Sequence, residues 1–84
     1  MTAAEESMAT TEAAPGIVID DAVQAGKPLI KGTRVPVEVV VGHLAAGDSM
    51  ATICAEYGVT EQGIRAALGY AARLLGDETV RAVG

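Results

Sequence analysis

The stretch MATICAEYGVTEQGIRAALGY, residues 50–70, constrains the fold more than any other part of the chain. Apolar residues recur three and four positions apart on both sides of Gly58, which predicts two amphipathic helices joined by a short turn. Glycine suits such a turn because it adopts a left-handed backbone conformation at no steric cost. Cys54 is a small residue in the middle of the first helix, where a crossing helix must approach closely. The combination is typical of a helix-turn-helix.

Capping residues predict where the helices begin and end. Asp48 or Ser49 suits the start of the first helix of the pair, and Thr60 suits the start of the second, which we expect to end at Gly76. A further helix is expected over residues 36–47, because its apolar residues fall on one helical face after a proline. The four valines of that segment favour a strand and oppose this interpretation.

The N-terminal part of the chain has a different pattern. The runs IVID and PLIK flank a glycine-containing loop and predict a short β hairpin over residues 17–35. Residues 1–16 are mostly Ala, Thr, Ser and Glu with little to bury, so we expect a disordered leader. The helix-turn-helix domain then covers residues 36–76, and residues 77–84 form a short tail. The fold class predicted is mainly α with a short N-terminal β hairpin.

Composition bears on assembly and location. Half of the residues are apolar, but Phe and Trp are absent, so the core must be small. A chain of this length buries only about 60% of its unfolded surface, which leads us to expect a homodimer or a higher homo-oligomer. The single cysteine forms no internal disulfide and fits a reducing cytoplasm. We find no signal peptide and no apolar run long enough for a bilayer, and therefore expect a soluble cytoplasmic protein without membrane contact.

If the motif reads DNA, its second helix enters the major groove. The outward-facing residues would then be Thr60, Gln62, Arg65, Ala66, Gly69 and Arg73. Gln62 suits an adenine edge and Arg65 a guanine edge. The small residues Ala66 and Gly69 would allow this face to approach DNA closely. The same spacing also fits helices that only form a core, and the slim face equally suits a second subunit. The net charge of −5 opposes strong nonspecific DNA binding. The sequence leaves both interpretations open, a helix that reads DNA and a helix that only packs.

Nothing in the sequence assembles a catalytic site. His43 has no Cys or Asp neighbour at ligand spacing, which favours a satisfied helix residue over a metal ligand. Cys54 falls on an apolar stripe and is expected to be a small buried residue. Asp20 and Asp21 point apart if they end a strand, so a turn or cap role is favoured. We expect no metal, no cofactor, no catalytic residue and no enzymatic activity.

The segment GKPLIKGTRVPV, residues 26–37, holds three of the six basic residues of the chain within eight positions. Together with LAAGDS, a tyrosine before the turn and AALGYA in the last helix, it resembles the domain of unknown function 433 family. The resemblance covers residues 17 to about 75. Gly58-Val59 departs from it, since many members have Pro and Leu or a similar residue there.

This resemblance implies a β hairpin followed by a homeodomain-like three-helix core, in a dimer. Members look like VapB-type antitoxins that pair with a PIN-like ribonuclease toxin. The expected function is therefore an antitoxin that neutralises such a toxin and binds its own operator DNA. Toxin binding would fall first to Arg34 and then to Lys31, because a guanidinium pairs with two carboxylate oxygens of a nuclease site at once. The alternatives are a DNA-binding regulator without a toxin and a small homo-oligomerisation module.

Overall fold

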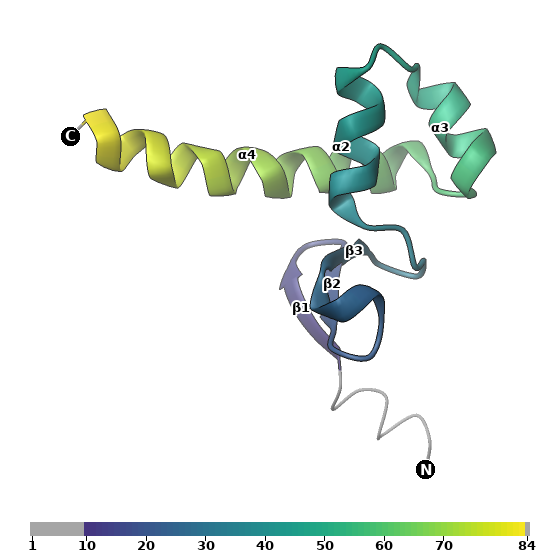
Figure 1. Cartoon of the computed structure of the whole chain (residues 1–84), viewed down its shortest axis with the longest axis horizontal. Helices are drawn as coiled ribbons and strands as arrows, with labels where there is room; N and C mark the ends of the chain where they lie inside the picture. Colours follow the sequence, from purple (N-terminus) through teal and green to yellow (C-terminus); the bar gives the residue numbers. More distant parts are fainter. Residues whose placement is uncertain (1–9, 84) are drawn as a thin grey trace.

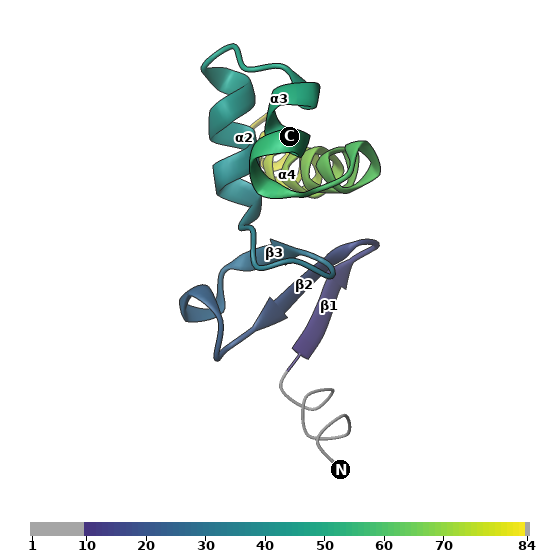
Figure 2. The ribbon, with the colours of Figure 1, turned by 90° about the vertical axis from the view of Figure 1, so that its right-hand side faces the viewer.

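A computed structural model of the chain describes residues 10–83. In chain order its elements are β1 (Thr10–Ala14), β2 (Ile17–Asp20), the 3-10 turn η1 (Gln24–Gly26), β3 (Pro28–Ile30), α2 (Val37–Ala45), α3 (Met50–Tyr57) and α4 (Glu61–Val83). Figure 1 shows α4 as the long axis of the molecule. Viewed along α4 in Figure 2, the sheet lies on one side of this helix, and α2 and α3 lie on others.

The three strands form one antiparallel sheet in the order β1-β2-β3. The predicted fold class, mainly α with a short hairpin and a homeodomain-like core, is therefore wrong: a three-stranded sheet precedes three helices. The additional strand is β1, from a segment that we expected to belong to the disordered leader. It pairs with β2 through contacts such as Glu12 with Val18, after Gly16 (φ 80°) has reversed the chain. Residues 1–9 of the expected leader lie outside the described residues.

The helix starts and the turn between α3 and α4 follow the capping residues predicted from the sequence. The Ser49 hydroxyl accepts a hydrogen bond from the Thr52 amide at 3.1 Å, and the Thr60 hydroxyl accepts one from the Gly63 amide at 3.0 Å. Gly58 ends α3 in the left-handed conformation with φ 70°. These interactions are local, which is why the sequence alone reveals them.

Two features of the helices differ from what the propensities of their residues predict. The helix α2 forms despite its valines, because Val37 and Val40 become buried in the core and tertiary packing outweighs strand preference. The helix α4 continues past Gly76 to Val83, through the segment expected to be a tail. A glycine inside a helix costs only about 1 kcal/mol relative to alanine, so one glycine is not enough to stop it.

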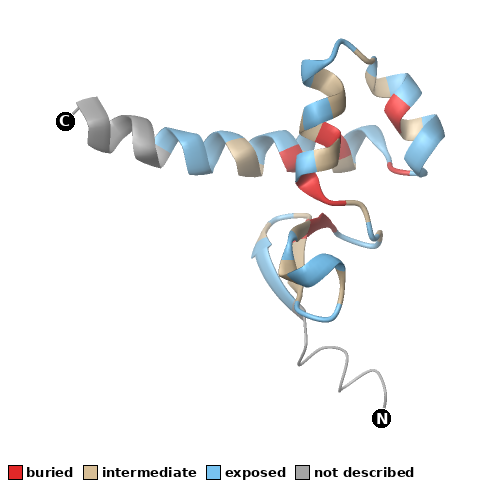
Figure 3. Cartoon of the chain, viewed as in Figure 1, coloured by how far each residue is buried: buried red, intermediate tan, exposed pale blue. Residues whose placement is uncertain are grey.

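The core lies where the sheet meets the helices. Its fully buried large side chains are Ile17 from β2, Val40 from α2, Ile53 from α3 and Ile64 from α4. Figure 3 shows the buried residues around the first half of α4, while the described residues toward its end are exposed. No described helix combines the length and the apolar character that crossing a membrane requires.

Candidate functional site

A three-residue turn, Gly58-Val59-Thr60, joins α3 to α4 and fixes the angle between them. The Gly58 amide donates to the Cys54 carbonyl at 2.9 Å, and Val59 is buried in the core. Cys54 itself is half-buried and packs against that core, which is more open than the buried position we expected. The turn is therefore held at its start by a hydrogen bond, in its middle by packing, and at its end by the Thr60 cap.

A stripe of exposed side chains runs along α4. We call the four residues Gln62, Arg65, Gly69 and Arg73 the α4 stripe; all four are exposed and they lie three or four positions apart. Arg65 pairs with Glu61 at 3.2 Å, but both side chains are more than half exposed. Such a surface pair contributes only about 0.3–0.5 kcal/mol, so Arg65 exchanges it for another acceptor at little cost. At Gly69 an added Cβ would meet nothing within 4 Å, which leaves the stripe open to close approach.

The two other residues predicted to face DNA have structural contacts. The Thr60 hydroxyl caps α4, and Ala66 lies against the turn between β1 and β2, where a Cβ built on Gly16 would be 3.0 Å from the Ala66 Cβ. A hollow of about 500 Å³ separates this turn from the start of α4, and Gln62 and Arg65 lie on its rim. The structure thus brings four of the six predicted residues onto one open face. The turn between β1 and β2 lies beside that face.

The three cations of residues 26–37 do not gather in one site. The Lys27 ammonium lies 2.6 Å from Glu38, and the Lys31 ammonium lies 3.8 Å from Glu12. The Arg34 guanidinium is exposed and makes no ion pair with any residue in the range 10–83. Of the two residues predicted to bind a toxin, Arg34 is therefore the one whose charge is not already paired within the described chain.

The backbone around Arg34 is well fixed although its side chain is exposed. The Thr33 hydroxyl donates to the Ile30 carbonyl at 2.7 Å and accepts from the Val35 amide at 3.0 Å. The Arg34 carbonyl accepts from the Gln24 side-chain amide at 3.4 Å. This loop also forms one wall of a hollow of about 370 Å³ that reaches Tyr57. The loop therefore presents a cation from a rigid support.

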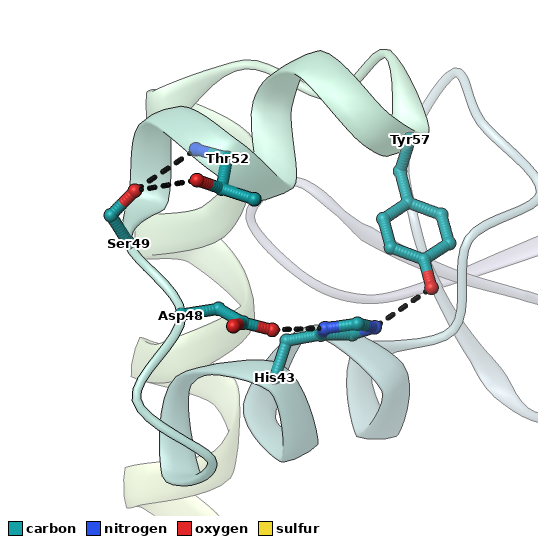
Figure 4. Close-up of polar contacts among 5 residues, drawn as sticks. All are labelled: His43, Asp48, Ser49, Thr52 and Tyr57. Carbon is teal, nitrogen blue, oxygen red and sulfur yellow. Dashed lines mark hydrogen bonds and ion pairs between the residues drawn. The ribbon is translucent and has the colours of Figure 1, made fainter.

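A hydrogen-bonded network around His43 was not predicted from the sequence. Its Nδ1 lies 2.6 Å from the Asp48 carboxylate, and its Nε2 lies 2.8 Å from the Tyr57 hydroxyl, as Figure 4 shows. With Asp48 as a carboxylate and His43 as a neutral imidazole, Nδ1 donates to Asp48 and Nε2 accepts from the Tyr57 hydroxyl. We call these three residues the His43 clamp, since they join the end of α2 to the end of α3.

A backbone turn explains how Asp48 reaches His43. Gly47 has φ 99°, and the Asp48 amide donates to the His43 carbonyl at 3.0 Å while the Gly47 amide donates to Leu44. This is the Schellman motif, which reverses the chain over the last turn of a helix. Glycine and an acidic residue directly after a helix with a histidine in its last turn are the sequence signal for this contact.

The remaining acidic and metal-ligating candidates have simple roles. The Asp20 carboxylate accepts from the Ala22 amide at 2.9 Å, which confirms the predicted turn role. Across the described part of the chain, no three His, Cys, Asp or Glu side chains come together as a metal ion would require. Among the residues predicted to form a site, Gln62 and Arg65 are exposed for hydrogen bonding and Arg34 is exposed for ion pairing.

Comparison with known proteins places the chain in a family. The model of the family "Protein of unknown function (DUF433)" matches residues 17–71. Among solved structures, the crystal structure of Rv2018 from Mycobacterium tuberculosis is similar, with a TM-score of 0.57 and 36% identity over 62% of this chain. This chain covers 24% of that protein, about a quarter of its length. No curated protein matches. The family match spans more than half of the chain, which therefore belongs to the DUF433 family.

Proposed function

We propose that this protein is a non-catalytic DNA-binding antitoxin that reads its own operator as a dimer through the α4 stripe. The observation that carries the proposal is the open face at the start of α4, where Gln62 and Arg65 are exposed directly after a helix-turn-helix turn. An amide and a guanidinium are the side chains that bind adenine and guanine edges in two-point hydrogen bonds. Gly69 supports this role because it leaves room for a DNA backbone.

The charge of the chain decides what kind of DNA binding to expect. With a net charge of −5, few phosphates are neutralised, so affinity for arbitrary DNA is low. Binding then depends on base contacts of Gln62 and Arg65 and on a small number of phosphate contacts such as Arg73. Specific binding with a shallow dependence on salt concentration is the expected signature.

The test is binding of labelled DNA from the region upstream of the gene, followed by fluorescence anisotropy. Gln62→Ala with Arg65→Ala should weaken binding by about 2–6 kcal/mol, since each two-point base contact contributes about 1–3 kcal/mol of discrimination. Arg34→Ala removes an exposed arginine from the loop between β3 and α2 and serves as the matched control. Unchanged affinity in the double variant would exclude the α4 stripe as the reading surface.

Neutralisation of a PIN-like ribonuclease toxin is the second part of the proposal. Arg34 supports it, because its guanidinium is exposed on a fixed loop and is unpaired within the described residues. PIN-type nucleases hold metal ions with clustered carboxylates, and a guanidinium binds two carboxylate oxygens at once.

Co-expression with the product of the neighbouring gene tests the toxin role. Arg34→Ala should abolish growth rescue, while Arg34→Lys should restore it only in part because an ammonium lacks the planar two-point geometry. Lys31→Ala should impair rescue less than Arg34→Ala, because the Lys31 ammonium lies 3.8 Å from Glu12 and cannot form the planar two-point contact. If no neighbouring product co-purifies with this chain, a DNA-binding regulator without a toxin becomes the better assignment. If DNA binding fails as well, an oligomerisation module remains.

A further inference from the structure

Two hollows meet along the exposed face of α2. The first has a volume of about 370 Å³ and includes Arg34 in its wall, and the second has a volume of about 490 Å³ and includes Asp48. Three residues line both hollows: Glu38, Val39 and Tyr57. We call the joined hollows the α2 trough. It runs from the loop before α2 to the turn after this helix.

The floor of the α2 trough is slim and partly apolar. Val39, Gly42 and Ala46 lie three or four positions apart, on α2 and at its end. They face away from the core side of the helix, where Val37 and Val40 are buried. An added Cβ at Gly42 would meet nothing within 4 Å. Because packed helices have axes only about 8–10 Å apart, a floor of small residues suits a second helix.

Tyr57 stands beside this floor as a fixed aromatic side chain. It is 39% exposed, and Figure 4 shows its hydroxyl directed toward His43, whose Nε2 lies 2.8 Å away. The two rings also meet edge to face, with centroids 5.2 Å apart. A side chain that is already held in place loses little conformational entropy when a partner covers it. Tyrosine is also enriched among the residues that dominate binding energies, so the His43 clamp holds a suitable anchor for a partner.

The two ends of the α2 trough carry opposite charges. At its start, the Arg34 guanidinium has no ion pair among the described residues. In its middle, Glu38 is balanced by Lys27 at 2.6 Å. With His43 neutral, the Asp48 carboxylate places a negative charge at the far end. A helix is negative at its carboxyl end and positive at its amino end, so a helix antiparallel to α2 matches both ends of the trough.

We propose that the α2 trough binds an amphipathic helix of the toxin, antiparallel to α2, with a carboxylate of the toxin on Arg34 and apolar side chains on Val39 and Tyr57. This inference rests on the toxin part of the proposed function and names the surface and the kind of segment that it takes. A strand is a poorer occupant, because the backbone groups of α2 are already paired within the helix. The nine residues of α2 span about 13.5 Å, so the trough covers about two and a half turns of the bound helix.

Titration calorimetry of the full chain with the purified product of the neighbouring gene tests the trough. Gly42→Leu should weaken binding at least about tenfold, because the new side chain fills the trough where the bound helix comes closest. It should leave the fold intact, since an added Cβ there meets open space. Gly76→Leu is the matched control, because Gly76 is equally open but lies in α4, outside the trough. Wild-type affinity of Gly42→Leu, or an equal loss in both variants, would overturn the proposal.

Two variants at Tyr57 test the anchor. Tyr57→Ala should also weaken binding at least about tenfold, as loss of an aromatic anchor does. Tyr57→Phe keeps the ring but loses the hydrogen bond to His43, so its affinity should fall between those of the wild type and Tyr57→Ala. An unchanged affinity of Tyr57→Ala would exclude Tyr57 as the anchor and count against the trough.

Photo-cross-linking tests the direction and the identity of the occupant. A cross-linker in place of Ala46 should label residues of one toxin helix that precede those labelled from Gln24, which lines the Arg34 end of the trough. The reverse order would contradict the antiparallel direction. Labels on a second copy of this chain would show that the trough is a self-association surface and would overturn the proposal.

The same measurements separate this inference from the function on which it rests. If Arg34→Ala abolishes toxin binding but Gly42→Leu and Tyr57→Ala do not, the toxin role stands and the trough fails. If the product of the neighbouring gene does not bind the wild-type chain at all, the toxin role fails and the trough fails with it.

Discussion

The two halves of α4 have similar apolar content, but the described side chains, at residues 61–76, have opposite surroundings in the two halves. In the first half, Ile64 and Ala67 are fully buried, and the sheet comes so close that a Cβ on Gly63 would lie 3.0 Å from the Ile30 side chain. In the second half, Leu74 and Leu75 are more than half exposed. An apolar stripe on a helix therefore predicts that the stripe will be covered, but the other elements of the chain decide which part they can reach.

Truncation of a leucine-sized side chain in each half should give the largest contrast. Ile64→Ala is expected to lower the free energy of unfolding by about 2–5 kcal/mol, because it removes buried methyl groups and leaves a cavity. Leu74→Ala should cost less than about 1 kcal/mol in dilute solution where monomers dominate, since little buried area is lost. Urea unfolding followed by circular dichroism measures both. Similar losses in the two variants would show that the second half is also buried within one chain.

The same substitution at two glycines sharpens the comparison at the backbone. Gly63→Val should destabilise the fold by about 1–3 kcal/mol, because its side chain overpacks against Ile30. Gly69→Val should change stability by less than about 0.5 kcal/mol, since an added Cβ there meets open space and valine forms helices slightly better than glycine. Thermal unfolding of the pair provides the measurement. A large loss at Gly69 would place a further element over the α4 stripe.

The smallest effect is expected at the His43 clamp, which lies outside α4. Tyr57→Phe removes the hydroxyl that donates to His43, and one hydrogen bond of this kind contributes about 0.5–1.5 kcal/mol. For a chain of this size that corresponds to a fall in melting temperature of a few degrees, roughly 2–12 °C. Tyr70→Phe serves as the control because no hydrogen bond of the Tyr70 hydroxyl is present in the described structure. An equal fall in both variants would argue against the clamp.

Local interactions explain which parts of the fold could be predicted. The helix caps at Ser49, Gly58 and Thr60 each involve residues three or four positions apart, so the sequence pattern is sufficient. The strand β1 could not be predicted in this way, because its polar, alanine-rich residues become a strand only by pairing with β2. The extent of α4 was missed because Gly76 was interpreted as a stop.

The same distinction between local and long-range interactions explains which parts of the candidate site could be predicted. Helical spacing alone placed Gln62 and Arg65 on one exposed face. Ala66 was predicted to be open, but the turn that covers it comes from a distant segment. The pairing of Lys27 with Glu38 and of Lys31 with Glu12 spans 11 and 19 positions, so the sequence did not reveal that Arg34 alone of these three lacks an ion pair among the described residues.

The edges of the small sheet have a consequence for self-association. An open edge strand is a template on which another chain can add a strand. The edge of β3 is covered by its own chain, through the bridge of Leu29 to Pro36 and the hydrogen bond from the Ile30 amide to the Val35 carbonyl. The other edge, β1, is five residues long and interrupted by a register shift after Glu12, which makes it a poor template. Both edges are thereby poor places for another chain to add a strand, which favours the helices over the sheet as the surface for contacts between copies.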